Sequence, residues 1–130
     1  MTAQQQRARP RALSAGITLL CLAFSACLVA GQILFKLAAE DIKPRLAAGS
    51  FVQAALSPWL LGAVILYAAT TVLWIYILTR APLSLAYPFS LLGAALVPAL
   101  AGLLFGEAVT WKYLAGLLLV LVGLFVIQAP

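Results

Sequence analysis

The sequence contains no histidine and only three acidic residues among its 130, so it lacks most groups that carry out acid–base chemistry. Histidine-based catalysis and histidine metal sites are therefore excluded, and the carboxylates form no catalytic dyad. The phosphate-binding loops G-x-x-x-x-G-K-[S/T] and G-x-G-x-x-G are absent, as is any pairing of a nucleophile with a base. We therefore expect a protein that moves or holds a molecule, not an enzyme, with no cofactor and no metal.

Charge of either sign is scarce: 8% of the residues are charged, 65% are hydrophobic, and the mean hydropathy is +1.13. Polar residues interrupt this apolar sequence at 40–45, 79–82 and 106–112. Four apolar segments result, at about 13–39, 59–78, 83–105 and 111–127. Each has about the 20 residues that a helix needs to cross a bilayer, and none alternates as barrel strands do. The sequence predicts an all-α integral membrane protein, with a basic N-terminal tail at 1–12 and a four-helix transmembrane domain at 13–130.

Basic residues guide the predicted orientation, because Lys and Arg are enriched on the cytoplasmic side of membrane spans. If the N-terminal tail is cytoplasmic, the basic residues on the cytoplasmic side are Arg7, Arg9, Arg11 and Arg80, and those on the opposite side are Lys43, Arg45 and Lys112. We expect both termini in the cytoplasm. The difference in basic residues between the two sides is small, so an antiparallel dimer of chains inserted in opposite directions is also allowed. The net charge of +5 does not indicate nucleic-acid binding.

Local signals predict where the spans begin and bend. Ser57 and Thr110 are expected to cap the second and fourth spans, and Pro58 to occupy a first helical position. A long loop is expected from Glu40 to Ser57, with Pro44 and Gly49 as helix breakers. In the third span Pro88 and Pro98 favour kinks, because each proline leaves a backbone carbonyl without its partner. Cys21 and Cys27 in the first span are expected to be packing residues, not a disulfide or a metal pair. The first span is too long for a cleaved signal peptide, so we expect it to remain.

Polar side chains inside the spans are few, and each is a candidate functional residue. Gln32 and Lys36 are four residues apart and share one face of the first helix. On one interpretation Lys36 extends to the lipid headgroups and Gln32 bonds to a neighbouring helix. On the other, the Lys36 ammonium lies in a cavity, where it attracts a phosphate or another anion.

Aromatic residues suggest a cavity wall in the second and third spans. Trp74 is deeper than an interfacial aromatic residue prefers, which favours a place in a cavity lining over a place in the interfacial belt. Tyr87 and Ser90 are three residues apart on one helical face, next to Pro88. Helix packing explains the glycines and alanines that follow, but it does not explain Tyr87.

The end of the chain adds a carboxylate and a possible dimer seam. Glu107 is either an ordinary surface-loop residue or an inward-facing partner of Lys36, which is expected on the same membrane side. Such a pair lowers the cost of placing two charges at the membrane boundary. Gly116 and Gly123 are seven residues apart on one face of the fourth span, a spacing that suits a helix–helix dimer interface.

The chain as a whole resembles the small multidrug resistance-type branch of the EamA-like drug/metabolite transporters. The features that carry the resemblance are Gly31-Gln32 with Lys36, Trp74, Ala81-Pro82, Leu85-Ala86-Tyr87-Pro88, Gly106-Glu107, and Gly116 to Gly123. Drug-exporting members carry a glutamate in the middle of the first span, where this chain has Leu28. The remaining features are most similar to the flippase subunits that move aminoarabinose-phosphoundecaprenol across the bacterial inner membrane.

This resemblance implies three expectations about function. The cargo is a lipid-linked sugar or a similar anionic lipid, moved by alternating access in a homodimer, or in a heterodimer with a related four-span subunit. The residues carried over to the headgroup path are Gln32, Lys36, Trp74, Tyr87 and Glu107, with Ser90 beside them. Two alternatives remain: an exporter of drugs, small cations or polyamines that uses Glu107, and a non-transporting scaffold for a partner enzyme.

Overall fold

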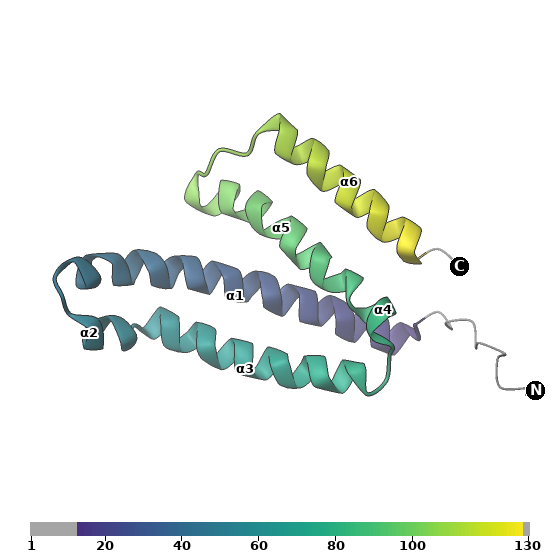
Figure 1. Cartoon of the computed structure of the whole chain (residues 1–130), viewed down its shortest axis with the longest axis horizontal. Coiled ribbons are helices and arrows are strands. Elements are labelled where there is room, and N and C mark those ends of the chain that lie inside the picture. Colours follow the sequence, from purple (N-terminus) through teal and green to yellow (C-terminus); the bar gives the residue numbers. More distant parts are fainter. Residues whose placement is uncertain (1–12, 129–130) are drawn as a thin grey trace, which may run out of the picture.

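The computed structural model describes residues 13–128, and every regular element in this range is an α-helix (Figure 1). In chain order the helices are α1 (Ala15–Ala47), α2 (Phe51–Ala55), α3 (Pro58–Leu78), α4 (Leu83–Ala86), α5 (Pro88–Phe105) and α6 (Trp111–Gln128). Three stretches are long and apolar enough to cross a membrane: α1, α3, and α4 together with α5; α6 is a shorter apolar helix. The prediction of an all-α, multi-pass membrane protein is confirmed. The predicted basic tail lies outside the described residues.

Helix α1 is the longest element, and it extends well past the predicted end of the first span. Its 33 residues correspond to about 50 Å at 1.5 Å per residue, against about 30 Å for a bilayer core. The predicted loop was wrong for residues 40–47, because the helix continues through Pro44 to Ala47. Pro44 lies three residues before the end of α1 and leaves the Glu40 carbonyl without its helical hydrogen bond, and an ion pair of 2.9 Å between Asp41 and Arg45 spans this position. The predicted break at Gly49 is confirmed: its φ of 74° is a left-handed conformation that favours glycine.

A polar cluster joins the end of α1 to α2 and to the start of α3. The fully buried Ser57 donates a hydrogen bond of 2.6 Å from Oγ to Asp41 Oδ2. Arg45, the ion-pair partner of Asp41, also donates from Nη1 to the Gln53 carbonyl at 2.9 Å. Ser57 is the N-cap residue of α3 and Pro58 occupies a first helical position, as predicted. The Ser57 hydroxyl, however, bonds to Asp41 and not to the first turn of α3, so it holds two helices together.

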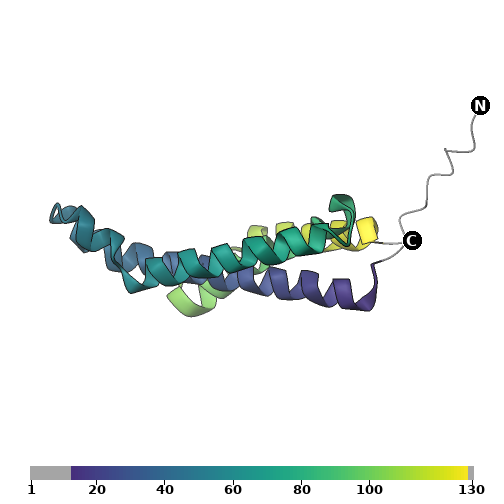
Figure 2. The same cartoon turned by 90° about the horizontal axis from the view of Figure 1, so that it is seen from below.

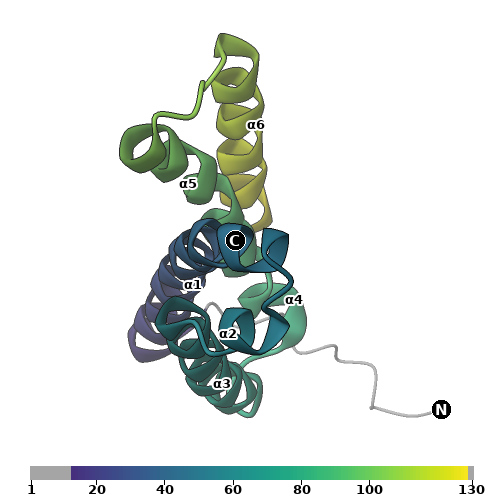
Figure 3. The ribbon, with the colours of Figure 1, turned by 90° about the vertical axis from the view of Figure 1, so that its left-hand side faces the viewer.

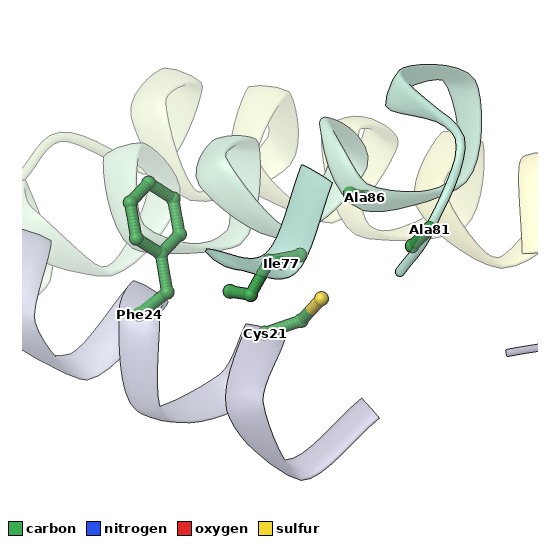
Figure 4. Close-up of a cluster of buried hydrophobic side chains, with 5 residues drawn as sticks. All are labelled: Cys21, Phe24, Ile77, Ala81 and Ala86. Atoms are coloured by element: carbon green, nitrogen blue, oxygen red, sulfur yellow. The ribbon is translucent and has the colours of Figure 1, made fainter. Parts of the chain in front are cut away.

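Helices α1 and α3 lie side by side and antiparallel (Figures 1 and 2). Near the start of α1, a cluster of buried side chains joins this pair to α4; its members are Cys21, Phe24, Ile77, Ala81 and Ala86 (Figure 4). Beside the cluster, the rings of Phe24 and Trp74 stack with their centroids 4.5 Å apart. Cys21 is buried there as a free thiol, which agrees with its predicted packing role.

The third apolar stretch is divided at Tyr87, where α4 ends and Pro88 begins α5. This break agrees with the predicted kink at Pro88, whereas Pro98 lies within α5. Helix α5 packs on α1 through small residues. The Ser25 hydroxyl donates to the backbone carbonyl of Phe89, and Gly93 lies so close that an added Cβ would be 3.3 Å from the Ser25 carbonyl oxygen.

The helices pack in series, and the arrangement is open. Helix α3 packs on α1, α1 on α5, and α5 on α6, so α6 lies away from the α1–α3 pair when the molecule is viewed from its end (Figure 3). The phenol of Tyr113 in α6 donates to the carbonyl of Ala95 in α5 at 3.1 Å. Thr110 caps α6, because its Oγ1 accepts from the Tyr113 amide at 3.3 Å, as predicted. The start of α1 and the end of α6 lie at the same end of the molecule (Figures 1 and 2).

Replacing Gly31 by alanine tests the close approach of α1 and α3. A Cβ at Gly31 would overlap the ring of Tyr67 on α3. Overpacking of this kind costs roughly 1–3 kcal/mol, against a gain of up to about 1 kcal/mol in helix propensity. We expect Gly31→Ala to lower the midpoint of thermal unfolding in detergent micelles, followed by circular dichroism.

Gly62→Ala is the matched control, because a Cβ at Gly62 on α3 would meet no atom within 4 Å. This variant should be neutral or slightly stabilised. If the two variants unfolded at the same temperature, the described contact between Gly31 and Tyr67 would be wrong.

Candidate functional site

A groove runs between α1 and α5, formed by two adjoining cavities of about 320 and 290 Å³. Both cavities are lined by Gln32 of α1 and Val97 of α5. The larger one continues toward the end of α5, with Lys36, Phe105 and Glu107 in its lining. The other is lined further by Leu28, Ser90, Gly93, Ala94 and Pro98. The groove is thus apolar along most of its length and charged at one end.

Lys36 is the centre of the charged end. Its Nζ lies 2.9 Å from Glu107 Oε1 and 3.7 Å from Glu40 Oε1. The same nitrogen is 5.8 Å from the centroid of the Phe105 ring, a cation–π distance. The Lys36 side chain keeps 42% of its surface exposed and the Glu107 side chain 49%. The ion pair that the sequence suggested between Lys36 and Glu107 is therefore present, and an approaching molecule can reach it.

Two glycines place Glu107 opposite Lys36. Gly106 ends α5 with a φ of 67°, a left-handed conformation that turns the chain back on itself. The returning segment then lies against Gly102, where an added Cβ would be 2.5 Å from Val109 Cγ2 and 3.2 Å from the Glu107 carbonyl oxygen. A larger residue at Gly102 would therefore displace the loop that carries the Glu107 carboxylate.

Gln32 is held at the junction of the two cavities by Tyr67, a residue not assigned to the site from sequence. Gln32 Nε2 donates to the Tyr67 hydroxyl at 2.7 Å. The Tyr67 ring packs over Gly31 and lies 4.9 Å from the ring of Phe35. The sequence feature that could have indicated Tyr67 is its spacing from Trp74: the two residues are seven apart on one face of α3.

The structure does not bring all the predicted site residues to the groove. Ser90 lines it, with its hydroxyl donating to the Tyr87 carbonyl at 2.6 Å. Tyr87 itself lies at the junction of α4 and α5 with 55% of its surface exposed. Trp74 stacks on Phe24 between α1 and α3, where it contributes to packing.

The predicted dimer seam faces a different part of the molecule. Gly116 lines a cleft between α5 and α6, where an added Cβ would meet no atom within 4 Å. Gly123 is seven residues further along the same helical face. A partner helix that used this seam would have to enter the cleft.

The charges at Lys36 define what the groove can bind. One ammonium faces two carboxylates, Glu40 and Glu107, so the cluster has a net charge of −1 when all three groups are ionised. A bare anion would have to separate Lys36 from both of them. A molecule that carries an anion and an amine can instead exchange partners, its anion on Lys36 and its amine on a released carboxylate. The site therefore favours a molecule with charges of both signs.

Exchanging the two charges tests the ion pair without reference to transport. Lys36→Glu places three carboxylates together and Glu107→Lys leaves two ammonium groups opposite one carboxylate, so each single variant should lower the thermal unfolding midpoint in micelles. The double variant restores one opposite-charge pair across the groove, and its midpoint should exceed that of either single variant. Additive effects in the double variant would show that the two side chains do not interact.

Comparison with known proteins finds two similar chains. One is a protein of Aeromonas salmonicida named probable 4-amino-4-deoxy-L-arabinose-phosphoundecaprenol flippase subunit ArnE, to which the chain is 35% identical over 71 residues. The aligned region covers 55% of this chain and 62% of that protein. Over 67 residues it is 37% identical to a protein of the same name from Aeromonas hydrophila, covering 52% and 59% of the two chains. The chain thus spans about six tenths of the length of these relatives. No family model matches the chain, and no solved structure does.

Proposed function

We propose that this protein is a subunit of a membrane transporter that moves an undecaprenyl-phosphate-linked sugar, or a similar lipid with a charged headgroup, across the bacterial inner membrane. The observation that carries the proposal is the accessible ion pair of Lys36 and Glu107 at the charged end of an apolar groove. Charged groups on membrane-spanning helices are costly, and they commonly mark the path of a polar cargo.

The chemistry of the groove matches such a headgroup. The Lys36 ammonium is a compact point charge suited to a phosphate. Glu107 is suited to an amine, and the relatives are named for a lipid whose sugar carries an amino group and whose linkage is a phosphate. In this proposal, cargo binding replaces the Lys36–Glu107 pair by two intermolecular pairs, so charges stay compensated throughout.

The groove is also suited to a cargo that stays attached to the bilayer. Its middle is lined by Leu28, Val97 and Pro98, with Gln32 and Ser90 as the polar groups along the way. A headgroup can then move past successive polar contacts between α1 and α5, while its long apolar chain remains in the lipid. Alternating access of the two ends of the groove would complete the transfer.

We further propose that the chain works with a second four-helix subunit, identical or related, and that both of its termini are cytoplasmic. The relatives are named as subunits. Packing in series leaves α3 and α6 as the two edges of the chain, and both present exposed apolar side chains, Ile65 and Val72 on α3 and Phe125 and Val126 on α6. The common end at which α1 begins and α6 ends agrees with an even number of crossings (Figure 1).

Export of a small cation is the second candidate, and the excess of carboxylates around Lys36 favours it. Proton release when a polyamine is added to the purified protein, lost in Glu107→Gln, would support it. The position of Lys36 is an argument against this candidate, because the ammonium already occupies the place that a cationic cargo would need.

Binding and transfer of undecaprenyl-phosphate-linked 4-amino-4-deoxy-arabinose test the main proposal. The chain is reconstituted in vesicles of lipids without amines, and a membrane-impermeant amine reagent reports how much cargo becomes accessible with time. Native mass spectrometry of the same preparation reports binding. We expect Lys36→Gln to reduce binding and to lower transfer to the rate of protein-free vesicles, because the phosphate loses its counter-charge.

Lys43→Gln is the matched control, since it removes the same charge from an exposed position near the end of α1. It should bind and transfer the lipid as the wild type does. Acetylation of the lipid's amine should weaken its binding to the wild type. Glu107→Gln should bind the acetylated and the unmodified lipid equally well. Unchanged binding in Lys36→Gln, or a wild-type chain that does not bind the lipid, would overturn the proposal.

A further inference from the structure

A cleft of about 500 Å³ lies between α5 and α6, on another side of α5 from the groove. Ala94 is the one residue that lines both the cleft and the groove, so α5 separates them. The walls of the cleft are mostly small and aliphatic: Leu91, Ala94, Ala95, Gly116, Leu117 and Val120. Its volume lies in the range of small-molecule sites, about 300–1,000 Å³.

Lys112 is the charged residue in the lining of this cleft, and it differs from Lys36 in having no counter-charge. Within residues 13–128, the ion pairs involve Lys36 and Arg45, and none involves Lys112. Tyr113, the other polar residue of the cleft, already donates its hydroxyl proton to the Ala95 carbonyl. The cleft therefore combines an apolar body with one uncompensated positive charge.

Among residues 13–128, no acidic side chain is placed to supply the missing anion. The sequence has three acidic residues, and all of them are engaged: Glu40 and Glu107 by Lys36, and Asp41 by Arg45 and Ser57. Helices α3, α5 and α6 contain no acidic residue, so none of them would bring a carboxylate to Lys112 if it entered the cleft from a second copy. Because Lys112 also lies in the first turn of α6, which contains no acidic residue, the positive end of the helix dipole adds to its field.

From this charge balance we infer that the cleft is a lipid site, in which an anionic phospholipid places an acyl chain between α5 and α6 and its phosphate on Lys112. The assignment of a phosphate to Lys112 does not rest on the proposed function, whereas the distinction between this lipid and the cargo does. There the phosphate of the cargo is assigned to Lys36, and a lipid with a single phosphate cannot occupy both places. The lipid of the cleft is thus a resident of the membrane and not the cargo.

Lipid retention by the chain of 130 residues tests this inference. The protein is purified in detergent and titrated with phosphatidylglycerol or with phosphatidylcholine of the same chains, and native mass spectrometry counts the bound lipids. Phosphatidylglycerol should bind as one molecule per chain, about fivefold more tightly than phosphatidylcholine, which is the preference expected for one lysine at the membrane surface. Lys112→Gln should abolish the preference, and Lys112→Arg should keep it.

Three further variants distinguish the cleft from other sites. Gly116→Leu places a side chain into the cleft without meeting other atoms at its Cβ, so it should reduce binding of phosphatidylglycerol although Lys112 is present. Lys36→Gln and Lys43→Gln should leave the preference unchanged. Loss of the preference in Lys36→Gln would place the lipid in the groove and overturn this inference, while leaving the proposed function intact.

An unchanged preference in Lys112→Gln would overturn it as well. The inference would also be overturned if the wild-type chain formed a dimer that binds no phosphatidylglycerol and that Gly116→Leu dissociates. A partner helix would then fill the cleft.

Discussion

The compensation of charge beside hydrocarbon is the constraint on which this structure depends. Charged side chains are expensive in or near the bilayer core unless they are paired or reach water. All three carboxylates of the chain are paired accordingly, Glu40 and Glu107 with Lys36, and Asp41 with Arg45. The Lys36–Glu107 pair joins α1 to the loop after α5, the Asp41–Arg45 pair lies within the last turns of α1, and Ser57 ties Asp41 to the start of α3.

Helix α1 is the scaffold of the molecule, because both α3 and α5 pack on it. Close approach depends on small residues: Gly31 admits the ring of Tyr67, and Gly93 lies over Ser25. The side chains of α1 that face α5 then form one wall of the groove, with Gln32 and Lys36 one turn apart. The packing of α1 thus provides the recess and presents its polar groups at the same time.

The sequence was sufficient for the apolar helices, and it offered the pairing of Lys36 with Glu107 as one of two interpretations. Long apolar stretches leave helices as the available structure in lipid; the side-chain cap predicted at Thr110 is confirmed, and Ser57 occupies the predicted N-cap position although its hydroxyl bonds to Asp41. Lys36 and Glu107 were placed on one side of the membrane by counting spans. The length of α1 was not predictable in this way, because Pro44 suggested a loop and the stabilising partner of Asp41 lies four residues later, at Arg45.

Contacts between helices were the part that spacing could not supply. Trp74 was expected in a cavity lining from its depth, but depth does not determine which face of α3 meets α1, and Trp74 stacks on Phe24. Tyr67 contacts Gln32 because Gly31 has no side chain, and this depends on how the two helices are rotated. In the same way, the seven-residue spacing of Gly116 and Gly123 defined a face of α6 but did not determine which element packs against that face.

Packing in series bears on how the protein forms during synthesis. Membrane helices enter the bilayer from the N-terminal end, and the contacts of α1 with α3 and α5 involve no residue of α6. The last helix can therefore dock after the others, through α5 and the hydrogen bond between Tyr113 and Ala95. A chain interrupted before α6 would already contain Lys36, Glu107 and the residues of α1 and α5 that line the groove.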